Sequence, residues 1–329
     1  MKKLLLIPIL LGALWSAYWV IGKSTLLKAL TQAQSDLAQD GITLSAPNVK
    51  IKGYPLRYHA VLTDLSLSGA KGTYTPEIIN ISADALRPTV WTLSAGKSAR
   101  IRLAGKDGHF WVFDLTADKM RLEFGSSISG KLKSVNAEFQ NLEAAPVSGG
   151  PPPLTAIDSG FVRLTPSAAP LQDGMQAAFD ISGIELAPGG AAVLQKAFGN
   201  RVDRLQGTGF AQGLISLAPD DIELWEQSGA VTVPDFTLHW GPVGFIGDVD
   251  LDMGSGGSGG ANGAATLGIS DGDALLAAFV QSGFLTQGQA MAGQFLLMAA
   301  PRDDQNQIVL TFPIQDNAVT ILGQTLHKF

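Results

Sequence analysis

The chain has 329 residues with a formal net charge of −6; 46% of them are hydrophobic and only 16% charged. This length can bury a sizeable core, and the low charge fraction excludes a chain kept disordered by self-repulsion. The absence of cysteine excludes disulfides and thiol chemistry, and the acidic balance, with no Lys/Arg run longer than Lys2-Lys3, argues against a nucleic-acid partner.

The first distinctive feature is an uncharged stretch at residues 4–21. As a helix it would rise about 27 Å, close to the thickness of a hydrocarbon core. Two lysines precede it, and Trp15, Tyr18 and Trp19 cluster at its far end, where aromatic rings suit the headgroup layer. We expect residues 1–22 to be a single-pass inner-membrane signal anchor with the body in the periplasm. The alternative is a cleaved signal peptide and a soluble periplasmic body.

After the anchor, residues 24–39 have apolar positions three and four apart and are followed by Gly41, which predicts a helix. From residue 42 the pattern changes to two-residue alternation punctuated by Gly, Pro and Asn, which predicts consecutive strands of a meandering antiparallel sheet. These strands are expected at residues 42–44, 49–51, 58–62, 65–67, 77–83, 98–103, 110–115, 119–124 and 134–142.

A Pro/Gly-rich run follows, and it can supply neither ladder donors nor a regular helix. We therefore expect a β-rich subdomain at residues 23–145, a Pro/Gly connection at 146–155 and a second β-rich subdomain with short helices at 156–329. The second subdomain has expected strands at 160–164, 177–186, 208–217, 230–240 and 246–253, helices at 191–198, 273–281 and 289–300, and a closing hairpin at 308–313 and 319–322. The predicted fold is mainly β (α+β). One N-terminal membrane helix precedes a long curved antiparallel sheet with a few helices.

Two glycine-containing runs match motifs without their structural context. Gly22-Lys23-Ser24-Thr25 looks like the end of a P-loop, but Ala17 stands where the first glycine is required, and an apolar span replaces the preceding strand. Residues 256–260 satisfy the nucleophile-elbow pattern inside a flexible low-complexity run with no helix after it. Neither run predicts a site.

Acidic and histidine residues are the remaining candidates for metal or acid–base chemistry. Asp248, Asp250 and Asp252 alternate with apolar residues, so a strand would place three carboxylates on one face. The calcium-loop pattern fails at Met253 and Gly259, which favours a solvated strand face. The acidic clusters at 220–223 and 303–304 are interpreted as turn or surface charge. The histidines are scattered without zinc-binding spacing: His59, His109, His239 and His327.

The most distinctive short run is residues 53–58, a tight turn that delivers an aromatic residue and an arginine into a strand. With the closing segment at 310–323 and the overall layout, it resembles an uncharacterised envelope family of alphaproteobacteria, domain-of-unknown-function family 2125. The resemblance covers nearly all of the chain and implies no established activity. Its family-like motif, of unknown role, is Gly53, Tyr54, Pro55 and Arg57. The layout is also similar in style to AsmA-like envelope proteins, which are anchored in the same way and form long curved sheets with an apolar groove thought to handle lipid.

The sequence therefore favours a membrane-anchored, non-catalytic periplasmic protein that binds lipid or another amphipathic envelope molecule in an apolar groove. The alternative is a structural or interaction scaffold that docks other envelope proteins through sheet edges and loops. A hydrolase is less favoured, because no catalytic motif keeps its context. Expected partners are the membrane and a lipid or an envelope protein, and no catalytic, metal or cofactor-binding residue is predicted.

Overall fold

The computed structural model describes residues 2–39, 41–104, 110–127, 131–167, 173–188, 192–217, 219–254, 260–303, 306–321 and 324–328. At residues 2–13, 29, 192–193, 219–220 and 319–328 it describes the backbone alone. The chain divides into two compact units. Unit 1 is Met1–Ile128 with Glu143–Pro152, and unit 2 is Ser129–Leu142 with Pro153–Phe329.

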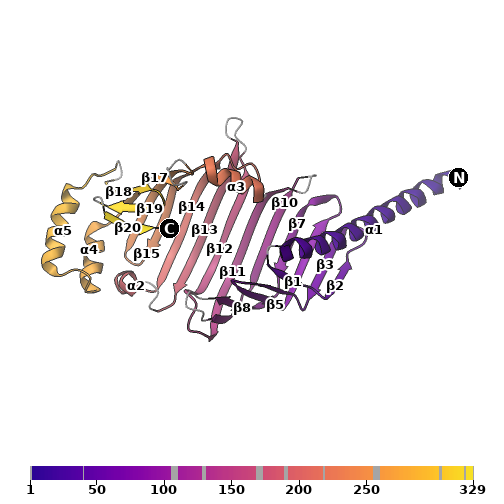
Figure 1. Cartoon of the computed structure of the whole chain (residues 1–329), viewed down its shortest axis with the longest axis horizontal. Coiled ribbons are helices and arrows are strands. Elements are labelled where there is room, and N and C mark those ends of the chain that lie inside the picture. Colours follow the sequence, from indigo (N-terminus) through magenta and orange to yellow (C-terminus); the bar gives the residue numbers. More distant parts are fainter. Residues whose placement is uncertain are drawn as a thin grey trace. The chain divides into compact units, whose positions relative to one another are not determined.

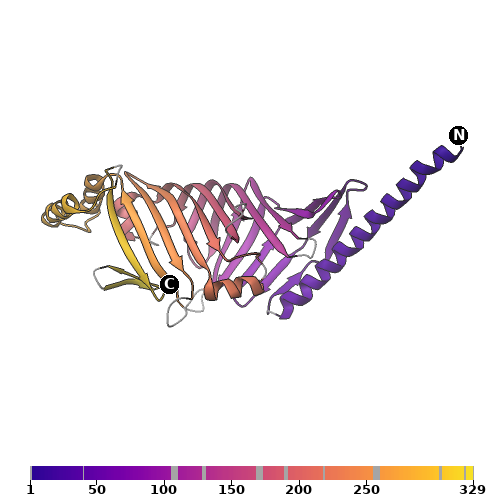
Figure 2. The same ribbon diagram turned by 90° about the horizontal axis from the view of Figure 1, so that it is seen from above.

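Helix α1 (Lys2–Gln39) joins the uncharged stretch and the following expected helix into one continuous element of unit 1 (Figures 1 and 2). It ends with Gly41 at a φ of 73°, and Ile42 N donates to Leu37 O at 2.8 Å, a C-terminal pattern that glycine favours. Within the described part of the chain, no helix is both long and apolar enough to cross a membrane. The side chains of residues 2–13, in the expected anchor, lie outside the described residues.

The strands of unit 1 pair in antiparallel ladders. One ladder runs in the order β1, β4, β5, β8, β9 and the last part of β11, and the other runs β2, β3, β6, β7 and β10. The strands are β1 (Thr43–Ser45), β2 (Asn48–Lys52), β3 (Arg57–Thr63), β4 (Ser66–Gly69), β5 (Gly72–Pro76), β6 (Ile78–Asp84), β7 (Arg87–Ala95), β8 (Ser98–Ala104), β9 (Phe110–Thr116), β10 (Lys119–Ser126) and β11 (Leu132–Ser148), which belongs to unit 1 from Glu143 onward.

The two ladders of unit 1 are halves of the same long hairpins, bent in the middle. The pairs Thr63↔Ile78 and Leu67↔Tyr74 keep one register, although Asp64 between β3 and β4 has a φ of 59°. Backbone hydrogen bonds continue across the neighbouring interruptions, for example from Gly96 N to Ile78 O at 2.7 Å. The interruptions therefore form a line of bends across the sheet and do not end it.

The core of unit 1 lies where α1 covers the sheet. Strand β3 alternates exposed or half-buried residues with buried ones, as expected for a strand with one covered face. Its buried Ala60 and Leu62 form a cluster with Leu65 and Ile79, and Leu26 and Leu30 of α1 pack against that cluster. Leu26 and Leu30 are four residues apart and therefore lie on the same face of α1, the face that contacts the sheet. This contact explains the helical spacing of apolar residues at 24–39.

Unit 2 is an antiparallel meander in which each strand from β12 to β20 pairs with the next. Its strands are β12 (Leu154–Pro166), β13 (Gly174–Leu186), β14 (Arg201–Gln212), β15 (Ala230–Trp240), β16 (Val243–Asp252), β17 (Asn262–Ile269), β18 (Ile308–Gln315), β19 (Ala318–Ile321) and β20 (Gln324–Lys328). Figure 1 shows β12 to β15 side by side, with α3 near one end of these strands and α2 near the other.

The described connections of unit 2 contain the helices α2 (Ala192–Phe198), α3 (Pro219–Ser228), α4 (Gly272–Gln281) and α5 (Gln287–Ala299). Helices α2 and α4 cover one end of the sheet, where Phe198, Phe245, Ile269 and Ala278 are buried in one cluster. The Asp271 side chain accepts from Ala274 N at 2.8 Å and begins α4, and Thr286 with Gln289 forms a capping box on α5.

The structure confirms a mainly β, antiparallel fold with a few helices. It corrects several elements, because no strand or helix was expected at β5, β7, β17, β20 or α3. Strand β14 begins at Arg201, seven residues before its expected start. The first residues of the expected Pro/Gly connection lie in β11. Pro146 faces Phe113 there at a shift in register, a place that tolerates a residue without an N–H.

Candidate functional site

One face of the unit 2 sheet, here called the apolar face, consists of apolar side chains and glycines. Residues that pair directly across antiparallel strands share a face. The pairs Phe179↔Gly207, Gly207↔Phe236 and Phe236↔Gly247 therefore place these residues on the same side. Extended in register across β12 to β18, the apolar face includes Val162, Ala177, Phe179, Ile181, Leu205, Phe236, Leu238, Val249, Leu251, Ala265, Leu267, Leu310 and Phe312.

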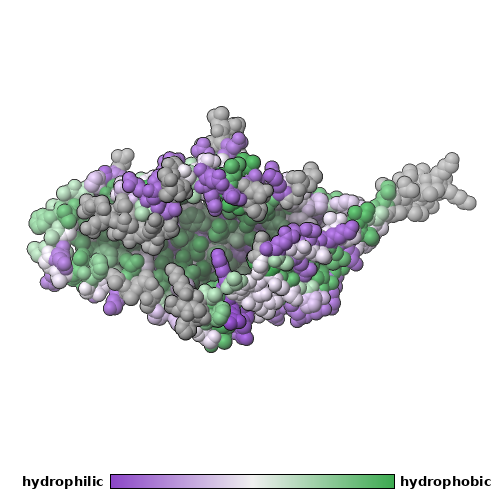
Figure 3. Space-filling view, viewed as in Figure 1, coloured by the Kyte–Doolittle hydropathy of each residue, from purple (hydrophilic) through white to green (hydrophobic). Residues whose placement is uncertain are grey.

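The middle of the apolar face remains partly open. Phe179, Leu205, Phe236, Val249 and Leu267 are each half-buried, whereas the fully buried cluster lies at the end covered by α2 and α4. In Figure 3, apolar residues gather in a hollow over the middle strands, among more polar borders. None of the side chains that define this face carries a charge, so it can offer a ligand dispersion and hydrophobic contact only.

Glycines let aromatic rings lie flat along the apolar face. A Cβ on Gly207 would lie 2.8 Å from Cζ of Phe179, and one on Gly247 would lie 2.4 Å from Cε1 of Phe236. In the same way, the Phe139 ring occupies the space beside Gly160. Each ring occupies the space that a side chain on the neighbouring strand would fill, which adds aromatic area to this face.

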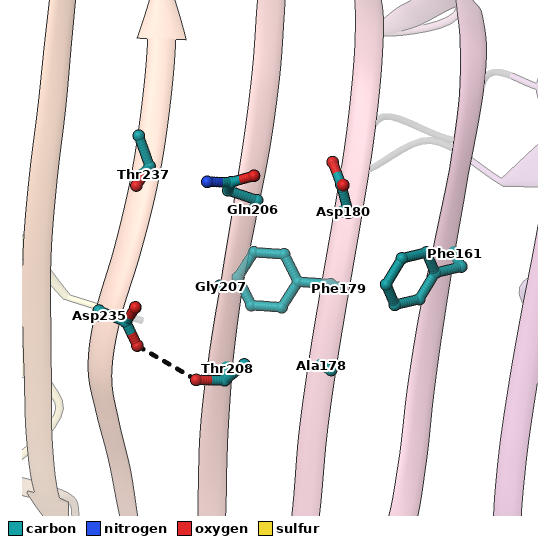
Figure 4. A pocket seen from close by; sticks show the side chains of 9 residues that line it. All are labelled: Phe161, Ala178, Phe179, Asp180, Gln206, Gly207, Thr208, Asp235 and Thr237. Carbon is teal, nitrogen blue, oxygen red and sulfur yellow. Dashed lines mark hydrogen bonds between the residues drawn. The ribbon is translucent and has the colours of Figure 1, made fainter.

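The opposite face of the same strands, here called the polar face, carries the charges. Arg204 forms a two-pronged ion pair with Asp180, with Nε–Oδ1 at 2.9 Å and Nη2–Oδ2 at 2.7 Å. Thr208 donates to Asp235 at 3.1 Å, as Figure 4 shows. Along each strand, successive side chains point to opposite faces of the sheet. The charged and hydroxyl side chains therefore lie on the polar face, and the apolar ones lie on the apolar face.

The ion pair between Asp180 and Arg204 on the polar face shifts the pKa values of both side chains, and each shift favours the charged form. Hydrogen bonds from Arg204 hold the pKa of Asp180 below its usual range, and those from Asp180 raise the pKa of Arg204. A shallow pocket of about 230 Å³ lies beside Asp180 and is lined by Phe161, Ala178 and Thr237, among other residues (Figure 4). Its two carboxylates, on Asp180 and Asp235, are each hydrogen-bonded within the chain.

The three alternating aspartates lie where the alternation places them. Asp248, Asp250 and Asp252 are exposed on the polar face of β16, while Val249 and Leu251 lie on the apolar face. Thr232 donates to Asp250 at 3.2 Å. Among the described residues, no group of three acidic, histidine or cysteine side chains could hold a metal ion.

The acidic cluster near residue 220, expected as turn or surface charge, lies on helix α3 and not in a turn, and Glu223 is exposed there. Asp221 accepts a short hydrogen bond from Ser216 and another from Lys131 Nζ at 3.3 Å. Both interactions lower the pKa of Asp221, and the bond from Ser216 is the larger cause.

The structure describes the side chains of two histidines. His59 lies 3.3 Å from Asn80, and His239 is exposed on β15. The elbow-like serine at 258, His109 and the side chain of His327 lie outside the described residues.

The family-like motif lies against the aromatic end of α1 within unit 1. Trp15 Nε1 donates to Pro55 O at 2.9 Å, and Trp19 Nε1 donates to Arg57 O at 3.0 Å. The peptide bond between Tyr54 and Pro55 is cis. Gly53 has a φ of 103°, and a Cβ there would lie 2.6 Å from Arg57 O, so this position requires glycine.

Aromatic rings complete this contact, here called the aromatic clasp. Trp19 stacks on Tyr58 at 5.9 Å and meets Tyr54 edge-on at 5.6 Å. Burial raises the pKa of Tyr58, and the neighbouring Tyr18 adds to the shift. Gly22 completes the face, because a Cβ there would lie 2.2 Å from the Tyr58 hydroxyl. The sequence signal was available: positions 15, 19 and 22 share one helix face.

Unit 1 has an apolar cavity of its own, of about 510 Å³, between Gly41 and Ile42, which follow α1, and the strands β4, β5 and β8. Leu67, Tyr74, Ile101 and Leu103 line it with Ile42. Partial burial raises the pKa of the Tyr74 hydroxyl. This volume falls within the range of about 300–1,000 Å³ typical of small-molecule sites.

Comparisons with known proteins add one finding. The family described as "Uncharacterized protein conserved in bacteria (DUF2125)" matches residues 19–323. No curated protein and no solved structure matches the chain. The alphaproteobacterial source and the likeness to AsmA-like proteins stay expectations of the sequence.

Proposed function

Because the chain belongs to the family of uncharacterized proteins conserved in bacteria, DUF2125, whose description names no activity, we propose a function from the geometry of unit 2. The chain is a membrane-anchored protein of the bacterial envelope, with its body in the periplasm. It binds the acyl chain of a lipid or of another amphiphile on the apolar face. The anchor rests on the uncharged stretch at residues 4–21, whose flanking charge pattern favours export of the body.

The observation that carries this proposal is the uncharged, half-open apolar face. A soluble domain rarely leaves a contiguous apolar surface larger than a few hundred Å² without a binding role. Here helices α2 and α4 contribute to the buried cluster at one end of the sheet, whereas the rings of Phe179 and Phe236 stay partly exposed. An acyl chain matches this surface, because it gains from burial and requires no hydrogen-bond partner.

The test compares neighbouring residues of β14 that face opposite ways. The full chain is purified from bacterial membranes, and its bound lipid is measured by extraction and native mass spectrometry. Leu205→Glu places a charge on the apolar face, and Gln206→Glu places the same charge on the polar face. We expect copurifying lipid to fall at least tenfold in the first variant and to stay unchanged in the second.

A steric variant guards against misfolding caused by the charge. Ala177→Phe enlarges a half-buried position of the apolar face without adding a polar group. It should reduce bound lipid while circular dichroism remains that of the parent. A parent chain without lipid would contradict the proposal. Loss of lipid through Ile101→Trp in the cavity of unit 1, but not through Leu205→Glu, would place the ligand elsewhere.

A scaffold function is the second candidate, and helix α5 favours it. Met291, Phe295 and Met298 form an exposed apolar stripe at helical spacing, while Leu297 on the other side packs toward the core of unit 2. Exposed methionine and aromatic side chains suit a protein-docking surface. Chemical crosslinking in intact membranes should then yield a larger species that is lost in Phe295→Glu, with bound lipid unaffected.

A further inference from the structure

One end of unit 1 gathers exposed apolar side chains from three segments. Tyr18 of α1 donates to Ala85 O at 3.0 Å, and Ala85 N donates to Leu56 O at 2.9 Å, so α1, the loop before β3 and the β6–β7 turn meet. Leu56 is 61% exposed and Leu86 is 71% exposed, both at the tips of connections. The other exposed members are Leu14, Tyr18, Ile21 and Tyr54. We call this region the apolar tip.

The charge of the apolar tip differs in sign from that of the chain. In residues 14–23, 52–57 and 84–87 the charged side chains are Lys23, Lys52, Arg57, Arg87 and Asp84. These segments thus carry four cationic side chains and one carboxylate, although the net charge of the whole chain is −6. Asp84 is engaged locally, because its Oδ1 accepts from Leu86 N at 2.8 Å. Cations around exposed apolar and aromatic groups are the pattern that binds anionic lipid surfaces.

The apolar tip is also continuous with the uncharged part of α1. The clasp holds the second half of the stretch at residues 4–21 against the hairpins through Trp15 and Trp19. From there α1 extends away from the sheet of unit 1, as Figures 1 and 2 both show. A bilayer that accepts the uncharged stretch would therefore meet Leu56 and Leu86 in its interfacial layer.

We propose that the apolar tip inserts into the interfacial layer of an anionic bilayer, with Leu56 and Leu86 in contact with lipid. In this arrangement the aromatic clasp holds α1 at a fixed angle to the hairpins, so that the helix and the apolar tip reach the same membrane surface. This inference rests on the membrane association in the proposed function, but it concerns unit 1 alone and is independent of the apolar face of unit 2.

The absence of cysteine makes a site-specific test possible. Leu56→Cys and Leu86→Cys are each labelled with the polarity-sensitive dye NBD in the full chain. Ala70→Cys, in the β4–β5 turn, is the matched control. It lies at the far end of the same hairpin, on the order of 40 Å away along the strand. The chains are reconstituted into vesicles of phosphatidylcholine with phosphatidylglycerol and isolated by flotation.

We expect NBD emission at positions 56 and 86 to rise severalfold and to be quenched by nitroxide-labelled lipid, while the label at 70 is quenched only by aqueous iodide. Vesicles of phosphatidylcholine alone should weaken the lipid quenching at both tips, because the cations lose their counter-charge. Floated chains whose tip labels behave like the label at 70 would overturn the proposal, as would chains that do not float. Lipid bound to unit 2, measured by native mass spectrometry on the same chains before they are reconstituted, reports separately on the proposed function.

Discussion

At the scale of single residues, glycines set beside aromatic rings recur in both units. Gly22 makes room for Tyr58, and Gly207 makes room for the Phe179 ring. In each case a backbone without Cβ lets a large ring lie close to a neighbouring element. The helical glycine in particular has a cost, since alanine is favoured over glycine by about 1 kcal/mol in a helix interior. That cost is offset by the ring contact.

We predict that Gly22→Ala weakens the aromatic clasp. The new methyl group would clash with the Tyr58 hydroxyl, and Tyr58 has little freedom to move because it is 3% exposed and stacked on Trp19. The expected loss in stability of unit 1 is about 1–3 kcal/mol, the usual cost of overpacking. Chemical denaturation monitored by tryptophan fluorescence would measure it. Gly288→Ala in α5, with nothing within 4 Å, is the control and should be neutral or slightly stabilising.

A second prediction at this scale concerns the pH dependence of the Asp180–Arg204 pair. Its folded-state carboxyl pKa is lowered, so the pair's stabilisation is complete above the unfolded pKa of about 3.9 and is lost as pH falls through the folded value. Asp180→Asn should therefore cost up to about 1 kcal/mol at pH 7, the range for exposed pairs, and nothing at the acid end. Urea denaturation at several pH values measures this. In an Arg204→Gln background the pH-dependent difference should vanish, and its persistence would contradict the assignment.

At the scale of elements, the connections at one end of unit 2 supply the buried core that the open sheet lacks. Phe198 at the end of α2 contacts Trp240, Phe245 and Phe279, with ring centroids between 5.4 and 6.0 Å apart. These rings come from α2, β15, β16 and α4, so one cluster ties two helices to two strands. The covered end can then be rigid while the middle of the apolar face stays partly exposed.

We predict that Phe198→Ala destabilises unit 2 by about 3–5 kcal/mol, as is typical for removing a buried phenylalanine ring. The side chain is 6% exposed, and its removal would leave a cavity between the helices and the sheet. Phe295→Ala in α5 is the matched control, because that ring is 71% exposed and its loss should change the free energy of unfolding by less than about 0.5 kcal/mol. Equal effects in thermal denaturation would refute the role given to this cluster.

At the scale of the whole molecule, stability should depend on the ligand. A ligand that binds only the folded chain adds to the free energy of unfolding by mass action. The apolar face belongs to unit 2 and the apolar tip to unit 1, so lipid can act on each unit through different residues. Ligand binding and surface binding are therefore separable by mutation.

We predict that monomeric lysophosphatidylcholine at a hundredfold excess over its dissociation constant stabilises the delipidated chain by about 2.7 kcal/mol. Gln206→Glu should respond like the parent, and Leu205→Glu should not respond. Differential scanning calorimetry of the unit 2 transition measures the effect. A parent chain that gains nothing from the amphiphile would argue against an acyl-chain ligand.

Sequence pattern alone determined that this protein is mainly β and antiparallel, with a helix ahead of the sheet and helices near residues 192–198 and 272–281, because alternation, capping and turn residues act over a few positions. It did not reveal β7, which begins Arg-Pro, or β17, whose small residues give little contrast in hydropathy. The three aspartates of β16 were placed correctly on one strand face, since alternation is local.

Only the tertiary structure decided which residues form the apolar face and what the motif at residues 53–57 contacts. The apolar face depends on the register of strands from β12 to β18, for example Phe179 with Gly207, and register is set by pairing between distant segments. The motif meets Trp15 and Trp19 across 38 to 40 positions in the chain. Such contacts arise from packing of whole elements, which no short window of sequence encodes.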